Sequence, residues 1–528
     1  MGLNSILRLV CGLLVATALA ISAGAQKTGD YVPGEVLVKF VSGPQSKSVK
    51  ASSNRAIGAT IVEELGDLSW QRVRLPEAMK IDEAIAKYKD MPGVEYAQPN
   101  FYYHLLATPN DPQFSSGTMY GLFKIAAPSA WNLPGQSTGS SDVVIADIDT
   151  GMRYTHEDLA GNAWHNPGEP ATPNGVDDDG NGFIDDYYGW DFRFNDADPI
   201  DLDNGVSASH GTHTAGTIGA VGNNLVGVVG VNWNVKLMTI KIFNNTVSDD
   251  TTSAMLVNAY SYIRMMKLRG INIRATNNSY GGCTEACGYD QATKDGLDAL
   301  GDAGVVNVFA AGNGGTNNDT APSYPASYTS PSVIAVAASD SNDNKASFSQ
   351  YGLNSVDVAA PGVTILSTVP TGYASSGWSG TSMATPHVTG AVALLAAYMP
   401  TLSAASLKAS ILNNVDVLPA WNGLVKTGGR LNVFKAMQNP TVCTFMPATP
   451  SMTVPTKGGV FTVNITAGGP NCDYTAKGTG TWIKVLSTNP MSGNGIVTFR
   501  VSVNPTVTRT GTVKVGDQTI TVTQWRGH

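Results

Sequence analysis

Apolar runs of strand length alternate with segments of helical length between about Leu122 and Ala436. The expected strands are DVVIADIDTG, VKLMTIKIF, INIRATNNSYGG, VVNVFAAGN and SVIAVAAS, and the expected helices include TSAMLVNAYSYIRMMKLRG and DQATKDGLDALGDAG. Continuous apolar strands separated by helices are typical of a parallel sheet that helices cover on both faces. The alternation therefore predicts an α/β domain with a doubly wound, mostly parallel sheet.

Polar motifs follow several of these runs directly: DTG, NNSYGG and AGNGG. In sheets of this kind, functional residues gather at the carboxyl ends of the strands. We therefore expect a functional site at this edge of the sheet.

The same region contains each group that nucleophilic hydrolysis of an amide requires. Ser382 stands at the start of a strongly apolar helix, Asp149 ends a buried strand, and His210 supplies an imidazole. Backbone N–H groups at the helix start and the side-chain amide of Asn313 can donate to an oxyanion. A serine at a helix start is by itself usually an N-cap, so the prediction depends on the four residues together.

His210 and His213 lie three residues apart in HGTH, which leaves open whether they form a metal site. The segment lacks the glutamate and the spacing of a His-Glu-x-x-His zinc helix. Asp149 and Ser382 instead offer a partner for each side of one imidazole. We therefore expect His210 to be the base and His213 to be structural. The small residues that permit close packing here are Gly211, Ala215 and Gly216.

On these motifs the chain resembles the subtilisin-type serine proteases over roughly residues 108–435. DTG, HGTH and GTSMATPHV occur in the family's order, and AAGN and NNSYGG also match. The resemblance implies a serine endopeptidase that cleaves proteins or peptides through an acyl-enzyme on Ser382. It implies that His210 relays the proton, that Asp149 orients the imidazole, and that Asn313 and the Ser382 N–H stabilise the oxyanion.

The resemblance also implies where the substrate binds. Extended substrates of the family pair with segments matching NNSYGG, and FAAGN lines a second wall of the primary pocket. The implied substrate-binding residues are Ser279, Tyr280, Gly281, Gly282, Ala311 and Gly312. No acidic side chain falls in these walls, so we expect a preference for apolar or aromatic residues before the scissile bond. Asp147 departs from the family pattern, which usually has an apolar residue there, and the sequence assigns it no role.

An acidic stretch, NGVDDDGNGFIDDYYGWDF, places oxygen ligands at alternate positions before a glycine. It resembles the start of an EF-hand calcium loop without the closing glutamate, and a solvated acidic turn is the alternative. Relatives of the family carry calcium loops in similar insertions, which implies structural Ca²⁺ on Asp177, Asp179, Asn181 and Asp186. A second structural calcium site is implied by family position, with the ligands Asp111, Asp158 and Asn224.

The N-terminus predicts a signal peptide, residues 1–25, for bacterial export. Arg8 precedes an apolar run, Leu9–Ile21, and small residues then end at Ala25. Cys11 lies inside the apolar run, and we interpret it as part of the discarded peptide. The run is too short for a stable membrane span and no later run reaches that length, so we expect a secreted protein.

Residues 26–105 predict a small α+β unit, with strands in GEVLVKF and VEYAQPNFYY and a helix in DEAIAKYKDMPG. The unit resembles the inhibitory propeptides of these proteases, which makes it an intramolecular inhibitor of a zymogen. A generic accessory domain is the alternative. We expect the maturation cut between about Tyr103 and Thr108, ahead of a catalytic domain at 106–440.

Residues 441–528 predict short strands punctuated by Gly, Pro and Asn, as in a β-sandwich. The segment resembles bacterial modules of the BACON type, which implies a glycan or protein ligand. Four of the five cysteines remain once Cys11 is removed, an even number in an oxidising compartment. Local pairing is the simplest choice and free buried thiols are the alternative. The local pairs are Cys283–Cys287 and Cys443–Cys472.

The net charge of −8 and pI near 5.4 argue against a nucleic-acid partner, and we expect a monomer. Two other functions compete with the protease. One is a binding protein with an inactive protease domain, which need not keep all four catalytic groups. The other is a metallohydrolase, which a serine-specific phosphonate would distinguish.

Overall fold

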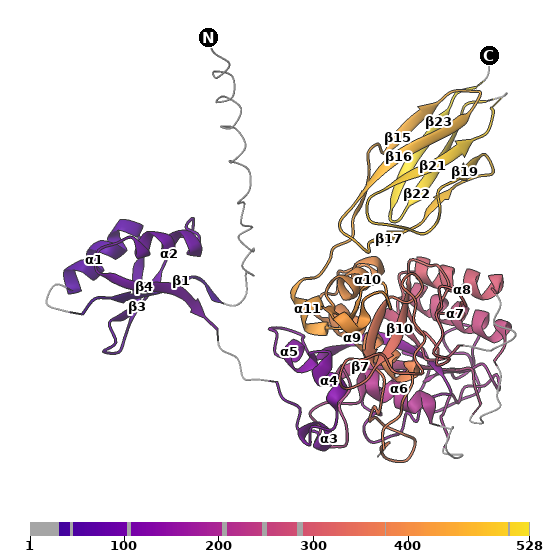
Figure 1. The fold of residues 1–528 in the computed structure, drawn as a ribbon, viewed down its shortest axis with the longest axis horizontal. Coiled ribbons are helices and arrows are strands. Elements are labelled where there is room, and N and C mark those ends of the chain that lie inside the picture. Colours follow the sequence, from indigo (N-terminus) through magenta and orange to yellow (C-terminus); the bar gives the residue numbers. More distant parts are fainter. Residues whose placement is uncertain are drawn as a thin grey trace, which may run out of the picture. The chain divides into compact units, whose positions relative to one another are not determined.

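The computed structural model describes residues 31–42, 46–102, 107–202, 209–244, 251–281, 289–374, 376–504 and 507–526. The chain divides into two compact units, Met1–Leu105 and Leu106–His528, and each is described by itself (Figure 1). The predicted signal peptide, Gly282 and the predicted pair Cys283–Cys287 lie outside the described residues.

The first unit is a four-stranded antiparallel sheet with two helices. The order in the sheet is β2-β3-β1-β4. Alternate β1 residues, such as Val36 and Val38, are buried together with Ala84 and Tyr88 of α2. The predicted helix and two strands are present, and α1, β2 and β3 add to them. The elements are β1 (Tyr31–Phe40), α1 (Ser46–Ile57), β2 (Thr60–Leu65), β3 (Trp70–Arg74), α2 (Ile81–Lys89) and β4 (Val94–Phe101).

A nine-stranded sheet forms the centre of the second unit, in the order β12-β13-β11-β10-β9-β8-β5-β7-β6. All its pairs are parallel except β12–β13, so the predicted α/β fold class is confirmed. Each of the five predicted strands is present. The strands are β5 (Gly139–Asp149), β6 (Gly189–Asp191), β7 (Asn234–Lys241), β8 (Ile273–Asn278), β9 (Val306–Ala310), β10 (Val333–Ser339), β11 (Val358–Pro361), β12 (Asp416–Val417) and β13 (Gly429–Arg430).

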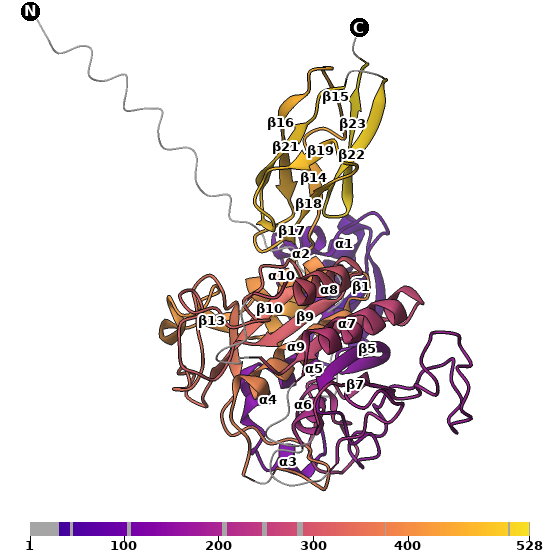
Figure 2. The same ribbon diagram turned by 90° about the vertical axis from the view of Figure 1, so that its right-hand side faces the viewer.

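Helices cover both faces of this sheet, and β5 shows how the sequence makes this possible. Val143 and Ile145 belong to a core shared with α6 and α9, whereas Val144 and Ala146 belong to a core shared with α7 and α8. Because successive strand residues face opposite ways, a strand that buries both faces needs consecutive apolar residues, and residues 143–146 of β5 supply them. Helices α7 and α8 lie side by side (Figure 2). The helices are α3 (Pro112–Ser115), α4 (Tyr120–Lys124), α5 (Ala127–Trp131), α6 (His210–Gly219), α7 (Ser253–Leu268), α8 (Gln291–Asp302), α9 (Thr381–Tyr398), α10 (Ala404–Asn413) and α11 (Val433–Gln438), with a 3₁₀ turn η1 (Pro419–Trp421).

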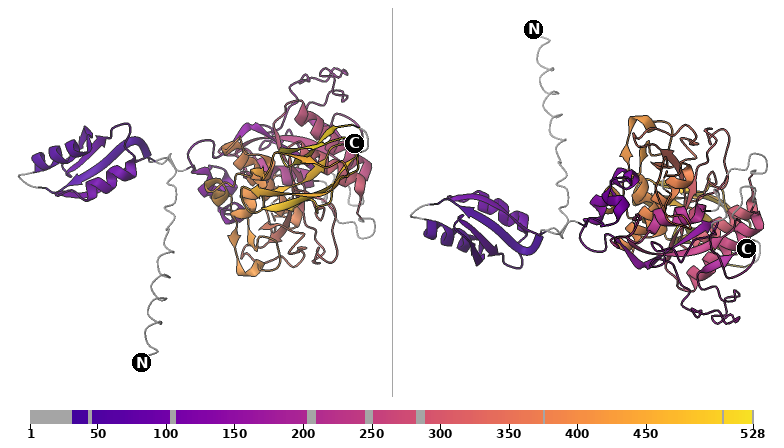
Figure 3. Two further views of the ribbon diagram at one scale, coloured as in Figure 1. Left: turned by 90° about the horizontal axis from the view of Figure 1, so that it is seen from above. Right: turned by 90° about the horizontal axis from the view of Figure 1, so that it is seen from below.

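The C-terminal segment is a β-sandwich, as predicted. Its two four-stranded sheets, β14-β16-β21-β19 and β15-β23-β22-β18, enclose one apolar core, and β17–β20 form a short extra pair (Figure 1). Seen from above, the orange and yellow strands of the sandwich overlie the α/β domain (Figure 3). Cys443 and Cys472 form a disulfide with a Cα–Cα distance of 5.4 Å. The strands are β14 (Phe445–Pro447), β15 (Ser451–Val454), β16 (Gly459–Ala467), β17 (Asp473–Tyr474), β18 (Ala476–Gly478), β19 (Ile483–Val485), β20 (Met491–Ser492), β21 (Gly495–Val501), β22 (Arg509–Val515) and β23 (Gln518–Gln524).

The sandwich packs directly on the α/β domain. Ala409 of α10 belongs to the sandwich core. Beside it, Lys408 pairs with Asp473 of β17 at 2.8 Å, and both side chains are more than nine-tenths buried. The two domains therefore share a desolvated contact as well as a chain connection.

Candidate active site

An aspartate–histidine pair lies where β5 meets the start of α6. Nδ1 of His210 is 2.8 Å from each carboxylate oxygen of Asp149, whose side chain is 3% exposed. The Thr150 N–H also donates to Asp149 at 2.7 Å. Since Nδ1 is occupied, Nε2 is the ring nitrogen of His210 that remains for proton transfer.

The pKa of His210 is set by two opposing effects. Burial of the imidazole lowers the pKa, whereas the charge and hydrogen bond of Asp149 raise it. Burial is the largest single effect, but the effects of Asp149 and of other acidic side chains nearby together outweigh it, so the pKa of His210 lies above its ordinary value of 6.5. The carboxylate thus stabilises the imidazolium that forms when His210 accepts a proton.

The start of α6 is fixed by groups outside the helix, because Ser209 makes no side-chain cap. The Thr150 hydroxyl accepts from the Gly211 N–H at 2.9 Å, and Asp201 accepts from the Thr212 N–H and hydroxyl at 3.1 and 2.6 Å. A Cβ on Gly211 would overlap the carbonyl of Gly151. The predicted small residue at 211 is therefore what allows α6 to approach β5 this closely.

Ser382 lies in the first turn of α9, where its N–H has no partner within the helix. Its hydroxyl donates to the Ser279 carbonyl at 2.9 Å, and the Ser279 hydroxyl donates to the Ser382 carbonyl at 3.0 Å. Pro386 has no N–H to donate four residues back, which leaves the Ser382 carbonyl available for this bond. The reciprocal pair joins the start of α9 to the end of β8.

Two N–H donors converge beside Gly380. The Asn313 Oδ1 accepts from the Thr381 N–H and hydroxyl, each at 2.9 Å, which turns the Nδ2 of Asn313 outward. A Cβ placed on Gly380 would lie 3.5 Å from this Nδ2 and 3.6 Å from the Ser382 nitrogen. Donors that meet at one point next to a nucleophile are the arrangement that stabilises an oxyanion.

The predicted substrate-binding residues lie at the ends of β8 and β9. The Tyr280 hydroxyl donates to Asn278 at 2.8 Å and lies 3.0 Å from the Tyr260 hydroxyl, so it is directed into the protein. Ser279 and Gly281 follow the end of β8, and Gly281 has φ +140°, a backbone conformation that favours glycine. On the other strand Ala311 is buried, and the Gly312 N–H donates to the Thr381 hydroxyl at 3.2 Å.

His213 is buried one turn into α6, away from Asp149. Its Nε2 lies 2.9 Å from the Ile365 carbonyl, and its ring stacks on Trp378 with centroids 4.8 Å apart. Burial lowers the pKa of His213 to about 3, which keeps the ring neutral. These contacts agree with the structural role predicted for His213.

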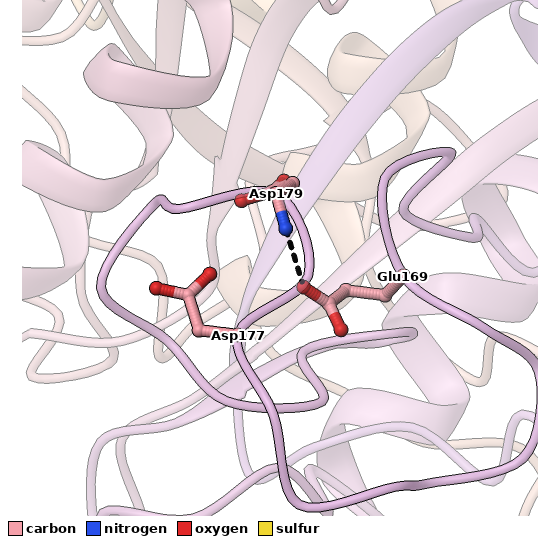
Figure 4. A group of neighbouring side chains, drawn as sticks. All are labelled: Glu169, Asp177 and Asp179. Atoms are coloured by element: carbon pink, nitrogen blue, oxygen red, sulfur yellow. Dashed lines mark hydrogen bonds between the residues drawn. The ribbon is translucent and has the colours of Figure 1, made fainter.

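The acidic stretch forms a cluster whose membership differs from the prediction. Carboxylate oxygens of Glu169, Asp177 and Asp179 lie within 4.8 Å of one another (Figure 4). Asp186 is outside this group, because its oxygens accept from Tyr262, Asn166 and Asn181 at 2.6 to 2.9 Å. The Asn181 oxygen accepts from the Phe183 N–H at 2.7 Å.

Glu169 was not predicted as a ligand, because it lies eight residues before Asp177 and outside the alternating pattern. Its side chain is 6% exposed, and its Oε2 has no hydrogen-bond donor among the residues that the structure describes. Asp179 Oδ1 likewise lacks a hydrogen-bond donor, although Arg269 lies 3.2 Å away. Buried carboxylate oxygens without donors, grouped with a third carboxylate, fit a hard cation such as Ca²⁺.

The second predicted cation site also gathers buried carboxylates. Asp111 and Asp158 are fully buried, and the loop that carries Asn224 donates to both. Within the described part of the chain, Asp111 Oδ1 has no hydrogen-bond donor. Burial raises the pKa of both groups, to about 6 for Asp158. An oxygen-only set with an orphaned atom fits Ca²⁺ here as well.

Comparison with known proteins gives two family matches. A model described as "Subtilase family" matches residues 140–442, and one described as "Fervidolysin N-terminal prodomain" matches residues 18–100. The first spans all the strands of the central sheet after the start of β5.

Individual relatives agree with these matches. Thermitase from Thermoactinomyces vulgaris is 40% identical over 332 residues, 63% of this chain and 99% of the relative. A thermophilic serine proteinase from Bacillus sp. (strain AK1) is 34% identical, covering 70% of this chain and 80% of the relative. Subtilisin E from Bacillus subtilis (strain 168) is 33% identical, covering 74% and 89%. Among the helices of the described residues, none has the length and apolar character to cross a membrane.

Proposed function

Because the chain belongs to the subtilase family, and is therefore a serine endopeptidase made as a zymogen, we propose that it cleaves peptide bonds through an acyl-enzyme on Ser382. The observation that carries the proposal is the double contact of His210 Nδ1 with Asp149, at 2.8 Å to each oxygen. This contact leaves Nε2 of His210 available as the proposed base for the Ser382 hydroxyl, which donates to the Ser279 carbonyl in this structure.

The proposed reaction has two stages. His210 takes the proton of Ser382 as the hydroxyl oxygen attacks the scissile carbonyl, and then gives that proton to the leaving amine. Water repeats the sequence on the ester, with His210 again as base. Asp149 stays ionised, holds the imidazole in one tautomer and stabilises its charged form.

Negative charge develops on the carbonyl oxygen in both stages. The Asn313 amide and the Ser382 N–H are the proposed donors, supported by their convergence beside Gly380. The bonds from Thr381 hold Asn313 in this orientation before substrate binds. Such preorganisation matters, since removal of an oxyanion donor in subtilisin itself costs about 10²–10³ in kcat.

The prodomain supplies an intramolecular inhibitor, and we propose that it is removed between about Tyr103 and Thr108. The signal peptide predicted at residues 1–25 supports export, and the relatives named above support a mature protein that acts on polypeptides. N-terminal sequencing of the protein from culture medium would give the maturation site. A mature N-terminus inside residues 31–102 would contradict the proposal.

Structural calcium is proposed at two sites. Glu169, Asp177 and Asp179 would hold one ion, and Asp111 and Asp158, with Asn224, would hold the other. Bound calcium would neutralise buried carboxylates that otherwise repel one another. The proposed ions stabilise the fold and take no part in the reaction.

A serine-specific fluorophosphonate tests the catalytic assignment. We expect the mature enzyme to be labelled stoichiometrically, with the adduct on the peptide that contains Ser382. Ser382→Ala should fold, take no label and fail to cleave a denatured protein. Ser376→Ala, an exposed neighbour, is the matched control and should keep both label and activity. Cleavage by Ser382→Ala would overturn the assignment.

A further inference from the structure

Asp147 is a buried carboxyl group for which the proposed reaction has no use. It is 2% exposed and lies two residues before Asp149, on the face of β5 that α6 and α9 cover. In the register of the sheet it stands opposite Thr239 of β7 and Asn277 of β8. A second acid this close to Asp149 is costly to bury, so its contacts require an explanation.

One carboxyl oxygen of Asp147 contacts the helix of His210. The hydroxyl of Thr214, four residues after His210 on α6, lies 3.0 Å from Asp147 Oδ2. The other oxygen contacts β8, because the Asn277 amide donates to Asp147 Oδ1 at 2.9 Å. Asp147 thus joins the strand of Asp149 to α6 on one side and to β8 on the other.

The network continues from Asn277 to Ser382. The Asn277 amide also donates to the Ser279 hydroxyl at 3.1 Å, which in turn donates to the Ser382 carbonyl at 3.0 Å. Thr389, two turns along α9 from Ser382, donates to the Asn277 oxygen at 3.0 Å. The three segments that carry Asp149, His210 and Ser382 are therefore connected through Asp147 and Asn277.

The charges around Asp147 favour its neutral form. Asp149 contacts the imidazole of His210 and accepts from the Thr150 N–H, whereas the hydrogen-bond partners of Asp147, Thr214 and Asn277, are neutral. Lys241, opposite Asp149 on β7, donates to the Thr150 carbonyl. Burial and the charge of Asp149 raise the pKa of Asp147 well above its ordinary value.

The hydroxyl of Thr214 gives an independent geometric argument. It carries one proton but lies 3.0 Å from two acceptors, Asp147 Oδ2 and the Gly211 carbonyl. A proton on Asp147 Oδ2 makes both contacts hydrogen bonds: the carboxyl donates to Thr214, and Thr214 donates to Gly211. Gly211 follows His210 directly, so this chain of bonds reaches the backbone of the proposed base.

We propose that Asp147 is a positioning residue, held as a neutral carboxylic acid, that keeps the segments of Asp149, His210 and Ser382 aligned. The proposal rests on the function proposed above. It assigns Asp147 no contact with substrate. Asparagine can make the same bonds as the neutral acid, because its NH₂ donates to Thr214 and its oxygen accepts from Asn277.

Two substitutions separate this role from simple packing. Asp147→Val, which has the apolar character usual in the family, should lower kcat by about 10²-fold with KM little changed, the effect of slight misalignment. Asp147→Asn should restore kcat to within about threefold of the wild type. Circular dichroism and the melting temperature of each variant check that the protein is folded. Wild-type kcat in Asp147→Val would overturn the positioning role.

The pH profile of kcat/KM tests the neutral state. A charged Asp147 would raise the pKa of His210, so its replacement by Asn would move the acid limb to lower pH. We expect the acid limb of Asp147→Asn to match that of the wild type. Infrared difference spectra at neutral pH should show the C=O band of a protonated carboxyl in the wild type and its loss in Asp147→Asn.

A shifted acid limb in Asp147→Asn, or the absence of the protonated-carboxyl band in the wild type, would overturn the proposal that Asp147 is a neutral acid. The infrared measurement needs only the wild type and the isosteric variant, so it decides the matter even if Asp147→Val does not fold. Failure of the proposed function would be recognised separately, as wild-type enzyme that the fluorophosphonate does not label on Ser382.

Discussion

At the scale of single residues, His210 shows how a catalytic group depends on its neighbours. Its imidazole is partly buried, which alone would favour the neutral form, yet Asp149 at 2.8 Å and other acidic side chains nearby together outweigh this effect. The sequence alone was sufficient to pair these residues, because each belongs to a motif whose spacing is distinctive. It could not predict the direction of the pKa shift, since burial and charge act oppositely and only the geometry decides between them.

The raised pKa of His210 predicts the acid side of the pH profile. His210 must be neutral to accept a proton, so kcat/KM should fall as pH drops through a pKa above 6.5. Asp149→Asn should move that midpoint downward, because it removes the charge that raises the pKa, and should lower kcat by about 10⁴-fold, as in other serine proteases with this triad. Initial rates of hydrolysis of a peptide ester, measured across a range of pH, give both the midpoint of the acid limb and kcat. An acid limb at or below 6.5 in the wild type would contradict the prediction.

Gly380 provides a prediction on the oxyanion donors. An added Cβ meets only ordinary contact distances, and φ of 166° suits any residue, so Gly380→Ala should fold normally. Its methyl group would nevertheless occupy the space between the Asn313 amide and the Ser382 N–H. We expect kcat to fall by about 10²–10³-fold, like the loss of a donor, without a lower melting temperature. Asn313→Ala, which removes one donor, is the reference variant. If the losses of kcat in the two single variants added up in the double variant, the two positions would not act at one site.

At the scale of elements, the strands of the central sheet were the most predictable part. Runs such as 143–146 are apolar throughout because both faces are buried, and this pattern is typical of strands in a covered parallel sheet. The cluster at Glu169 was less predictable. Its glutamate comes from a separate turn. Asp186 is outside the cluster and accepts a hydrogen bond from Tyr262, a residue of α7. Contacts between elements distant in sequence leave no periodic signal within either segment.

Calcium binding at the acidic cluster should be measurable as stability. A calcium concentration about 100 times Kd would stabilise the fold by about 2.7 kcal/mol. We expect EDTA to lower the melting temperature of the inactive Ser382→Ala protein, which avoids self-digestion. Glu169→Gln should show a smaller response to calcium than the wild type.

Asp178→Asn is the matched control for that experiment. It likewise removes one negative charge next to the cluster, but Asp178 is exposed and lies outside the group of three carboxylates. Its response to calcium should remain that of the wild type. If Glu169→Gln and Asp178→Asn lost the same amount of stabilisation by calcium, net charge, and not the cluster at Glu169, would determine the response to calcium.

At the scale of the whole molecule, the C-terminal sandwich is an integral part of the second unit. The sequence predicted its strands and its disulfide from local patterns. It did not predict the docking on α10, because Lys408 lies in an ordinary helical context and Asp473 beside a cysteine. Only the assembled fold removes water from both side chains.

The ion pair Lys408–Asp473 should contribute to stability only while both partners are present. Lys408→Met would leave the Asp473 carboxylate buried and unpaired, at a cost of about 3–5 kcal/mol. Adding Asp473→Asn should recover much of this loss. The melting temperatures of the single and double variants measure both effects.

Lys477–Asp302, an exposed pair between the same two domains, provides the control. Lys477→Met should cost less than about 1 kcal/mol, because water already solvates both groups. If Lys477→Met and Lys408→Met lowered the melting temperature equally, burial would not be what distinguishes the two pairs.

The order of the elements along the chain also determines when the proposed catalytic site can first form during synthesis. Asp149 and His210 are synthesised well before Ser382, and α9 must then pack against β5, β8, β9 and β10, which all precede it in the chain. A ribosome-bound chain that ends before residue 382 has a scaffold and a base but no nucleophile. Protein synthesis itself therefore keeps the growing chain harmless to its neighbours, and the prodomain, which is made first, is already present when the nucleophile emerges.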